Sequence, residues 1–396
     1  MSHDLPTNDN AAPALVLPAQ LEELLNTCVQ TGASDLHLAP DLPPYLRLHG
    51  ILEPMSDRPV ISPATMLQLA RALVADFDTS AVTRTGSVDG ACSAAGARFR
   101  FNVFRRQGKL SIAMRRLEER FRSLEELGLP PILYDLCGLT DGLVIVAGPT
   151  GAGKSTTLAT LIDRINQSRR SHIVTIEDPI EYLHESSLSL VNQRQVGSDT
   201  ASFNDALVAS LRQDPDVILV GEIRDLATIR TAITAAETGH LVFTTVHAGD
   251  CVGAIERLVS VFPADEQNGI RRQLALVLRA IVTQHLLVVD GERAKQTDAE
   301  APTRRRRVAT SEIMMTTSAI SNLIATGKSA QIYSAMESGG GQGMQTLEEN
   351  LARLWANGYL SEFTAVGASR NPAIVRDRFA KLHRRPTATR GNGEGR

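Results

Sequence analysis

The stretch that decides the fold is GPTGAGKST, from Gly148 to Thr156. It fits the pattern GxxxxGK[ST] of a phosphate-binding loop and lies between an apolar strand-like run, LVIVA, and a helix-like run, STTLATLIDRI. Glycines in such a loop let backbone N–H groups point at phosphate oxygens, and the following helix adds its positive end. We expect Lys154 to bind the β- and γ-phosphates of ATP and Ser155 to bind Mg²⁺. The nucleotide-binding candidates are Gly148, Pro149, Thr150, Gly151, Ala152, Gly153, Lys154, Ser155 and Thr156.

Four short apolar runs, one of them leading into this loop, indicate a parallel β-sheet. They read LVIVAG (143–148), HIVTIEDP (172–179), VILVGE (217–222) and HLVFTTVH (240–247), and helix-like segments separate them. Strands of a parallel sheet are buried on both faces, so they read as continuous apolar runs rather than alternating ones. We therefore expect an α/β domain that binds its ligand at the carboxyl edge of the sheet.

Acidic residues follow two of these runs. Glu222 ends DVILVGE, the pattern of a Walker B strand, and is the candidate to polarise the attacking water and to support Mg²⁺. Glu177, Asp178 and Glu181 follow HIVTI, where a metal and a γ-phosphate would lie. We expect at least one of these three acids to serve the site, Asp178 as a metal ligand. The alternative for each is an ordinary surface acid at a strand end.

Two histidines, His240 and His247, bracket the run LVFTTV. A histidine at the edge of this sheet would sense the γ-phosphate or act across a subunit interface. A purely structural histidine is an equally good interpretation of each.

The first part of the chain predicts a small α+β domain. Helical periodicity covers 20–30 and 63–76, and alternating runs cover 34–40 and 45–50. Residues 98–117 predict a hairpin with its turn near Gln107–Gly108. Arg100 and Arg115 on this hairpin are candidates to reach a neighbouring subunit's nucleotide, and a solvated strand face is the alternative.

These patterns divide the chain into five parts. We predict a disordered leader (1–19), the first domain (20–117), a linker (118–135), the ATPase domain (136–383) and a disordered tail (384–396). From about Ser311 onward we expect helices. The basic run Arg304–Arg307 is interpreted as a solvated loop.

Composition narrows the class of protein. A net charge of −3 and 4% aromatic residues in 396 argue against nucleic acid as a partner. The four cysteines form no CxxC pair, so we expect free thiols in a reducing compartment. The apolar stretch Leu274–Val289 is interrupted by polar residues and falls short of the roughly 20 residues that span a membrane. We expect a cytoplasmic protein without direct membrane insertion.

Together the motifs resemble one family, the PilT-type retraction ATPases of type IV pili within the type II/IV secretion ATPases. The matching stretches run in family order: GASDLHLAPDLPPYLRLHG, GPTGAGKSTT, TIEDPIEYLH, LVNQRQVG, DPDVILVGEIRD, AAETGHLVF and GMQTLEENL. The resemblance implies a PAS-like first domain, a RecA-like ATPase domain with C-terminal helices, and a homohexamer acting on an inner-membrane pilus platform protein. It also implies that Glu222 is the catalytic glutamate. Glu177, Asp178 and Glu181 match the acidic box, His240 and His247 the histidine box, and Arg100 and Arg115 the trans-acting arginines.

The subtype rests on fewer residues. Assembly-type relatives carry a long extra N-terminal region and a four-cysteine zinc module, which this sequence lacks, so retraction is favoured. Two segments depart from the family's pattern: AISNLIA (319–325) has Ser321 where an arginine is usual, and HAGDC (247–251) replaces the usual residues after the second histidine. An accessory paralogue of a retraction ATPase, a scaffold subunit, and a secretion or DNA-transfer motor therefore remain as alternatives.

Overall fold

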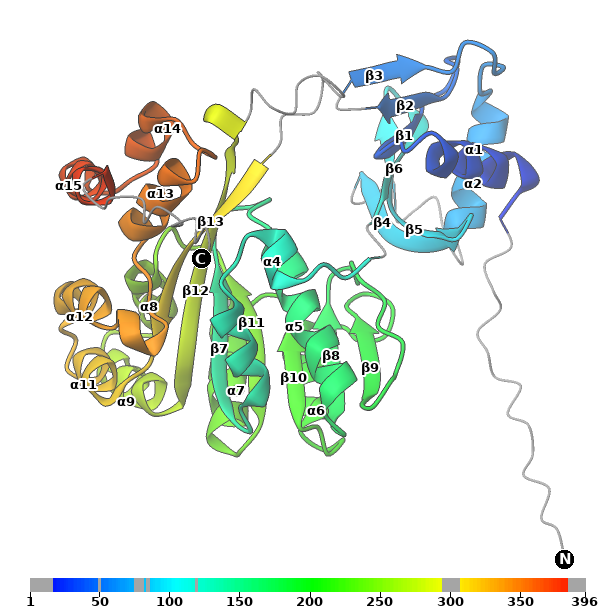
Figure 1. Cartoon of the computed structure of the whole chain (residues 1–396). Helices are drawn as coiled ribbons and strands as arrows, with labels where there is room; N and C mark the ends of the chain where they lie inside the picture. Colours follow the sequence, from blue (N-terminus) through cyan, green and yellow to red (C-terminus); the bar gives the residue numbers. More distant parts are fainter. Residues whose placement is uncertain are drawn as a thin grey trace, which may run out of the picture. The chain divides into compact units, whose positions relative to one another are not determined.

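The predicted apolar runs form the centre of a seven-stranded sheet in the order β13-β12-β7-β11-β10-β8-β9 (Figure 1). The computed structural model describes residues 17–48, 51–74, 82, 86–117, 120–293 and 307–383. The leader before residue 17, the tail after residue 383 and Arg304 to Arg306 of the basic run lie outside these residues. The chain divides into two units, Met1–Arg120 and Phe121–Arg396, and each is described by itself.

In its described residues, the first unit is an antiparallel sheet packed with the helices α1 and α2. Its strand order is β3-β2-β1-β6-β5-β4. The hairpin turns at Gln107 and Gly108, both with positive φ, as its sequence predicts. Leu25, Met66 and Phe99 are among the fully buried side chains of its core. The elements are α1 (Ala19–Gln30), β1 (Asp35–Leu38), β2 (Tyr45–Leu48), β3 (Ile51–Pro54), α2 (Pro63–Leu73), β4 (Ser87–Ala94), β5 (Ala97–Arg106) and β6 (Lys109–Arg116).

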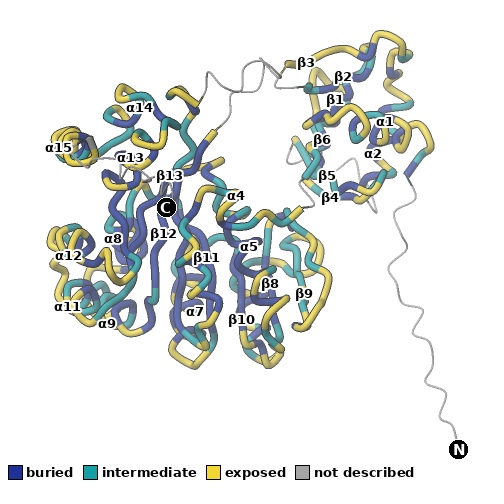
Figure 2. Tube along the Cα trace, in the orientation of Figure 1, coloured by how far each residue is buried: buried dark blue, intermediate teal, exposed yellow. Residues whose placement is uncertain are grey.

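The second unit is built around the parallel strands. Successive residues of β7 face opposite cores: Ile145 belongs to one apolar cluster, and Val144 and Val146 belong to another. Figure 2 shows these central strands buried between partly exposed helices. The strands are β7 (Gly142–Ala147), β8 (His172–Glu177), β9 (Leu190–Gln195), β10 (Val217–Val220), β11 (Leu241–Val246), β12 (Leu278–Val288) and β13 (Arg307–Met315). The helices among them are α5 (Lys154–Ser168), α6 (Phe203–Ser210), α7 (Leu226–Glu237), α8 (Cys251–Ser260) and α9 (Gln267–Val277).

Most of the segment expected to be a linker packs into the second unit. It forms α4 (Leu124–Leu127), begun by a capping box at Ser123, and η1 (Pro131–Gly138). Leu124 and Leu133 are fully buried in the cluster beneath α5. In the sequence, the charged residues around these leucines suggest an exposed linker. Because the leucines are buried, residues 124–135 are part of the second unit.

The C-terminal part is helical, but it starts later than expected. Residues 311–315 continue β13, which pairs antiparallel with β12 from Ala280↔Met315 to Val288↔Arg307, so the expectation of helices from Ser311 is wrong there. The apolar stretch before it divides between the end of α9 and β12. No helix among the described residues is long and apolar enough to span a membrane. The helical elements are α11 (Ser318–Ala325), η2 (Ser329–Gln331), α12 (Ile332–Ser338), η3 (Gly340–Gln342), α13 (Leu347–Ala356), α14 (Glu362–Gly367) and α15 (Pro372–His383). All four cysteines are buried and free.

Candidate nucleotide site

The phosphate loop connects the end of β7 to the start of α5. Gly148, Gly151 and Gly153 all have positive φ, which allows the backbone to curl around a ligand. A side chain at Gly148 would lie 2.4 Å from the carbonyl oxygen of Gln284, whereas positions 151 and 153 have nothing within 4 Å. The loop is therefore pressed against β12 at its start and open at the later glycines, where a phosphate would approach.

The side chain of Lys154 forms hydrogen bonds with the backbone of its own loop. Its Nζ donates to the carbonyl oxygens of Gly148 and Pro149, at 3.0 Å each. Burial lowers the pKa of Lys154, and Glu222 and Glu181 oppose that shift. Ser155 lies exposed in the first turn of α5, where the helix N-terminus favours anions. These residues fit a triphosphate with Mg²⁺, which takes only one or two protein ligands besides the phosphates.

Glu222 and His247 meet at the carboxyl edge of the sheet. Glu222 follows β10 and its carboxylate lies 2.7 Å from Arg224 Nη2 and 4.0 Å from His247 Nε2. Burial lowers the pKa of His247, and the nearby Lys154 and Arg224 lower it further, so the imidazole is neutral at neutral pH. The structure thus brings together Lys154, Glu222 and His247.

The three acidic residues at the end of β8 and just after it lie in three different environments. Glu177 accepts from Thr175 Oγ1 at 2.7 Å and from Gln193 Nε2 at 3.2 Å, and burial raises its pKa. Those bonds tie Glu177 to β8 and β9. Glu181 is the acid of this segment whose charge acts on Lys154, and Asp178 is exposed.

His240 does not join these residues. It precedes β11, at the amino end of the parallel strands, whereas His247 follows the carboxyl end. Its Nδ1 lies 2.9 Å from the carbonyl oxygen of Ala235, at the end of α7. In this chain His240 serves the α7–β11 turn.

Arg100 and Arg115 lie opposite each other on β5 and β6. Both belong to the first unit. Arg115 is 70% exposed although its Nε contacts Asp35 Oδ1 at 2.8 Å. Asp35, which the sequence analysis did not single out, also contacts Arg47 at 3.7 Å.

Three further residues, in the segments that follow β8 and β10, were not predicted from the sequence. Tyr182 donates its hydroxyl to Thr156 Oγ1 at 3.1 Å, and His184 stacks on Phe121 with ring centroids 4.6 Å apart. Tyr182 and His184 belong to TIEDPIEYLH, in which the acidic residues give the stronger signal. Arg224 follows Glu222 within GEIRD, and a positive charge two residues from the candidate catalytic acid is the signal that identifies it.

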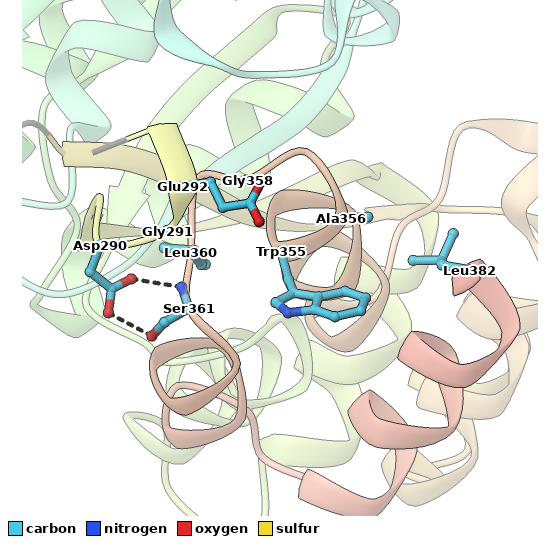
Figure 3. A pocket seen from close by; sticks show the side chains of 9 residues that line it. All are labelled: Asp290, Gly291, Glu292, Trp355, Ala356, Gly358, Leu360, Ser361 and Leu382. Carbon is cyan, nitrogen blue, oxygen red and sulfur yellow. Dashed lines mark hydrogen bonds between the residues drawn. The ribbon is translucent and has the colours of Figure 1, made fainter. Parts of the chain in front are cut away.

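A separate cavity of about 530 Å³ lies at the end of β12 and contains none of these residues (Figure 3). Trp355 and Leu382 line its apolar side. Asp290, on its rim, accepts from the backbone and hydroxyl of Ser361 at 2.8 and 2.6 Å. Its lining is Asp290, Gly291, Glu292, Trp355, Ala356, Gly358, Leu360, Ser361 and Leu382.

Comparison with known proteins shows the family to which the chain belongs. A family model described as type II/IV secretion system protein matches residues 12–362. The chain belongs to the type II/IV secretion family. Within the family it is 42% identical to the type IV pilus retraction ATPase PilT of Pseudomonas aeruginosa, over 87% of this chain and 96% of that protein. It is 36% identical to the type IV pilus ATPase PilU of the same organism, over 86% of each chain.

A solved structure of the pilus retraction motor PilT with bound ADP has the same fold. The TM-score is 0.81 at 40% identity, covering 90% of this chain and 99% of that one. The predicted α/β fold class, the resemblance to PilT-type members of the family and the prediction of an ATPase are confirmed.

Proposed function

We propose that this chain is the subunit of a homohexameric motor that hydrolyses ATP to drive type IV pilus retraction. It would act from the cytoplasm on a pilus platform protein of the inner membrane, with the first unit as a PAS-like domain. The observation that carries the proposal is the convergence of Lys154, Glu222 and His247 at one sheet edge, beside a phosphate loop. The likeness to PilT over most of both chains supports retraction as the output.

Each residue has a separate role in hydrolysis. Lys154 places a positive charge on the β- and γ-phosphates, and the loop amides bind the phosphate oxygens. Mg²⁺, held by Ser155 and supported by Glu222, would neutralise charge on the phosphates. Glu222 orients and polarises the attacking water, which requires it to exchange its 2.7 Å contact with Arg224 for that water. Neutral His247 donates a hydrogen bond toward the γ-phosphate.

Arg100 and Arg115 are proposed to complete a neighbour's site. A guanidinium supplied from another subunit stabilises charge in the transition state of phosphoryl transfer. The 70% exposure of Arg115 leaves its guanidinium accessible to a partner. In this arrangement a subunit alone would hydrolyse ATP slowly.

The first test is steady-state ATP hydrolysis by the wild-type chain beside Glu222→Gln and Lys154→Ala. We expect turnover in the wild type, bound nucleotide without turnover in Glu222→Gln, and no bound nucleotide in Lys154→Ala. Undiminished turnover in Glu222→Gln would remove Glu222 from the reaction.

A second test addresses the biological output. The wild-type gene, placed in a piliated strain that lacks its own retraction ATPase, should restore twitching motility, and Glu222→Gln should not. Restoration only when a second pilus ATPase is present would identify an accessory subunit, the alternative that the 36% identity to PilU supports. Active ATPase without any motility would favour a secretion motor.

A further inference from the structure

An ionic cluster, buried at Glu312 and partly exposed at Asp250 and Arg370, joins the C-terminal helices to the loop that follows His247. Arg370, between α14 and α15, forms ion pairs with two carboxylates that are distant in sequence. Its Nη1 lies 3.2 Å from Asp250 Oδ2, and its Nη2 contacts Glu312 on β13, whose side chain is 3% exposed. The guanidinium therefore bridges the loop after β11 and the last strand of the sheet.

Both carboxylates also hold the backbone after His247. Glu312 Oε1 accepts from the backbone N–H of Cys251 at 2.8 Å, and Asp250 Oδ1 accepts from that of Gly253 at 2.6 Å, capping α8. On the other side, His285 Nε2 lies 3.0 Å from the carbonyl oxygen of Gly249. Residues 249–251 are thus fixed by β12, β13 and Arg370 together.

Arg370 is itself held from the opposite side. Fully buried Glu348 on α13 accepts from the backbone N–H groups of Arg370 and Asn371, at 3.2 Å each, and from Tyr333 Oη at 2.9 Å. The Arg370 guanidinium lies over the Tyr333 ring, 5.8 Å from its centroid. The backbone of Arg370 is therefore held on α13, and its guanidinium lies against α12.

Stability alone does not account for this arrangement. Buried ion pairs contribute little net stability compared with apolar residues of the same volume, because desolvation offsets their attraction. The charges instead contribute a fixed geometry. They hold the backbone around Asp250, which lies three positions after His247. His247 Nε2 lies 4.0 Å from Glu222, and the backbone of His247 leads directly into this loop.

We propose that Arg370 is a positioning residue for ATP hydrolysis. By bridging Asp250 and Glu312 it holds loop 248–250, and through that loop it holds His247 opposite Glu222. The inference rests on the roles proposed above for Glu222 and His247 and does not depend on pili. It also accounts for the unusual HAGDC sequence, because Asp250 in that sequence supplies one of the two carboxylates.

The test compares kcat and KM of Arg370→Lys and Asp250→Asn with the wild type. Lysine keeps the charge but loses the fork that reaches two carboxylates. Asparagine still caps α8 but weakens the ion pair. We expect kcat to fall about ten-fold or more in Arg370→Lys and at least about three-fold in Asp250→Asn, with KM within two-fold of the wild type. KM should hold because the phosphate loop and Lys154 do not depend on Arg370.

Arg378→Ala is the matched control. Arg378 also lies on the C-terminal helices, where it pairs with Glu337 at 3.2 Å, but it does not contact loop 248–250. We expect kcat and KM of this variant to stay within two-fold of the wild type. All variants are compared as particles of wild-type size by light scattering, with nucleotide binding measured separately by fluorescence.

The double variant Asp250→Asn/Arg370→Lys tests whether the two residues act through one contact. Its kcat should equal that of Arg370→Lys alone, because the contact is already lost. Unchanged kcat in folded Arg370→Lys, an equal loss in Arg378→Ala, or multiplied losses in the double variant would overturn the proposal. Turnover that survives in Glu222→Gln would instead overturn the site assignment, so the two failures are distinguishable.

Discussion

Gly148 has no room for any side chain. With φ of 147° it occupies a backbone region that other residues avoid, and an added methyl group would lie 2.4 Å from the carbonyl oxygen of Gln284 and 3.0 Å from Ala152 Cβ. The nearest obstacle is backbone of a central strand, which cannot rotate away. The position of the whole phosphate loop against β12 therefore depends on the absence of a side chain at residue 148.

We predict that Gly148→Ala lowers the free energy of unfolding by about 3 kcal/mol or more and weakens nucleotide binding. Gly197→Ala is the control, because Gly197 also has positive φ but nothing within 4 Å, so it should cost only about 1–2 kcal/mol. Chemical denaturation and fluorescent-nucleotide titration measure the two effects. Equal losses of stability in both variants would contradict the steric argument.

The residues of the site differ in how far the sequence reveals them. Lys154 and Glu222 are predictable because phosphate and water chemistry dictate both their type and their place after a strand. Arg370 is not, because its role depends on Asp250 and Glu312 being brought to it by the fold. His240 is the opposite case, because its sequence pattern predicts a site residue and the fold places it elsewhere. It shares a motif with His247, but β11 lies between the two histidines and separates their environments.

At the scale of elements, α13 is fixed on β13 by a buried amide. Asn350 Oδ1 accepts from Thr310 Oγ1 at 2.8 Å and from the backbone N–H of Ser311 at 3.3 Å, and Asn350 is 1% exposed. Because these polar groups are buried, each needs the partner that the helix supplies.

We predict that Asn350→Ala lowers the free energy of unfolding by about 2–3 kcal/mol, because it leaves two buried donors without an acceptor. Glu349→Ala, at the exposed neighbouring position of the same helix, should change it by less than about 0.5 kcal/mol. Thermal unfolding in the presence of nucleotide compares the two. A small effect of Asn350→Ala would mean that water replaces the amide.

The segment between β8 and β9 contains a histidine whose titration opposes folding. Burial lowers the pKa of His184 from 6.5 to about 4. The unfolded chain therefore binds a proton near pH 6.5, while the folded chain resists it until about pH 4, so stability is lost as pH falls through this window.

We predict a loss of about 2 kcal/mol from this group between pH 8 and pH 5. His184→Phe keeps the ring stacked on Phe121 and removes the titration, so its stability relative to the wild type should rise by that amount at pH 5. Denaturant midpoints at both pH values provide the measurement. A difference between the proteins that does not change with pH would rule out His184 as the titrating group.

The elements also show why some strands are easier to predict than others. β7, β10 and β11 read as strands because continuous apolar runs fit a sheet covered on both faces. β13 does not, because Thr310, Ser311 and Glu312 are buried polar residues whose partners lie on α13, at Arg370 and elsewhere along the chain. In β13, polar residues that are hydrogen-bonded to distant parts of the chain stand where apolar residues would mark a strand. The local sequence pattern therefore does not predict this strand.

At the scale of the whole molecule, the proposed trans-acting arginine means that each active site needs residues from two subunits. We predict that Arg115→Ala and Lys154→Ala are each nearly inactive but recover activity when mixed and reassembled. A site works when its own subunit has Lys154 and its neighbour has Arg115, so an equal mixture should regain roughly a quarter of wild-type turnover.

Arg106→Ala is the control for this experiment. Arg106 is exposed at the end of the same hairpin, beside its turn, and should leave turnover unchanged when mutated alone. Inactive mixtures that still sediment as hexamers would place Arg115 outside the neighbour's site. Strict monomers in the presence of nucleotide would contradict the ring itself.

The strand order has a consequence for synthesis of the chain. β7, which leads into the phosphate loop, lies between β11 and β12, and both are translated later, with β11 beginning only at Leu241. At ordinary translation rates, a ribosome needs roughly 5 to 20 seconds to reach it. During that interval the apolar run GLVIVA has neither of its neighbouring strands. The nascent chain therefore depends on chaperones, or on rapid synthesis and folding, to avoid aggregation.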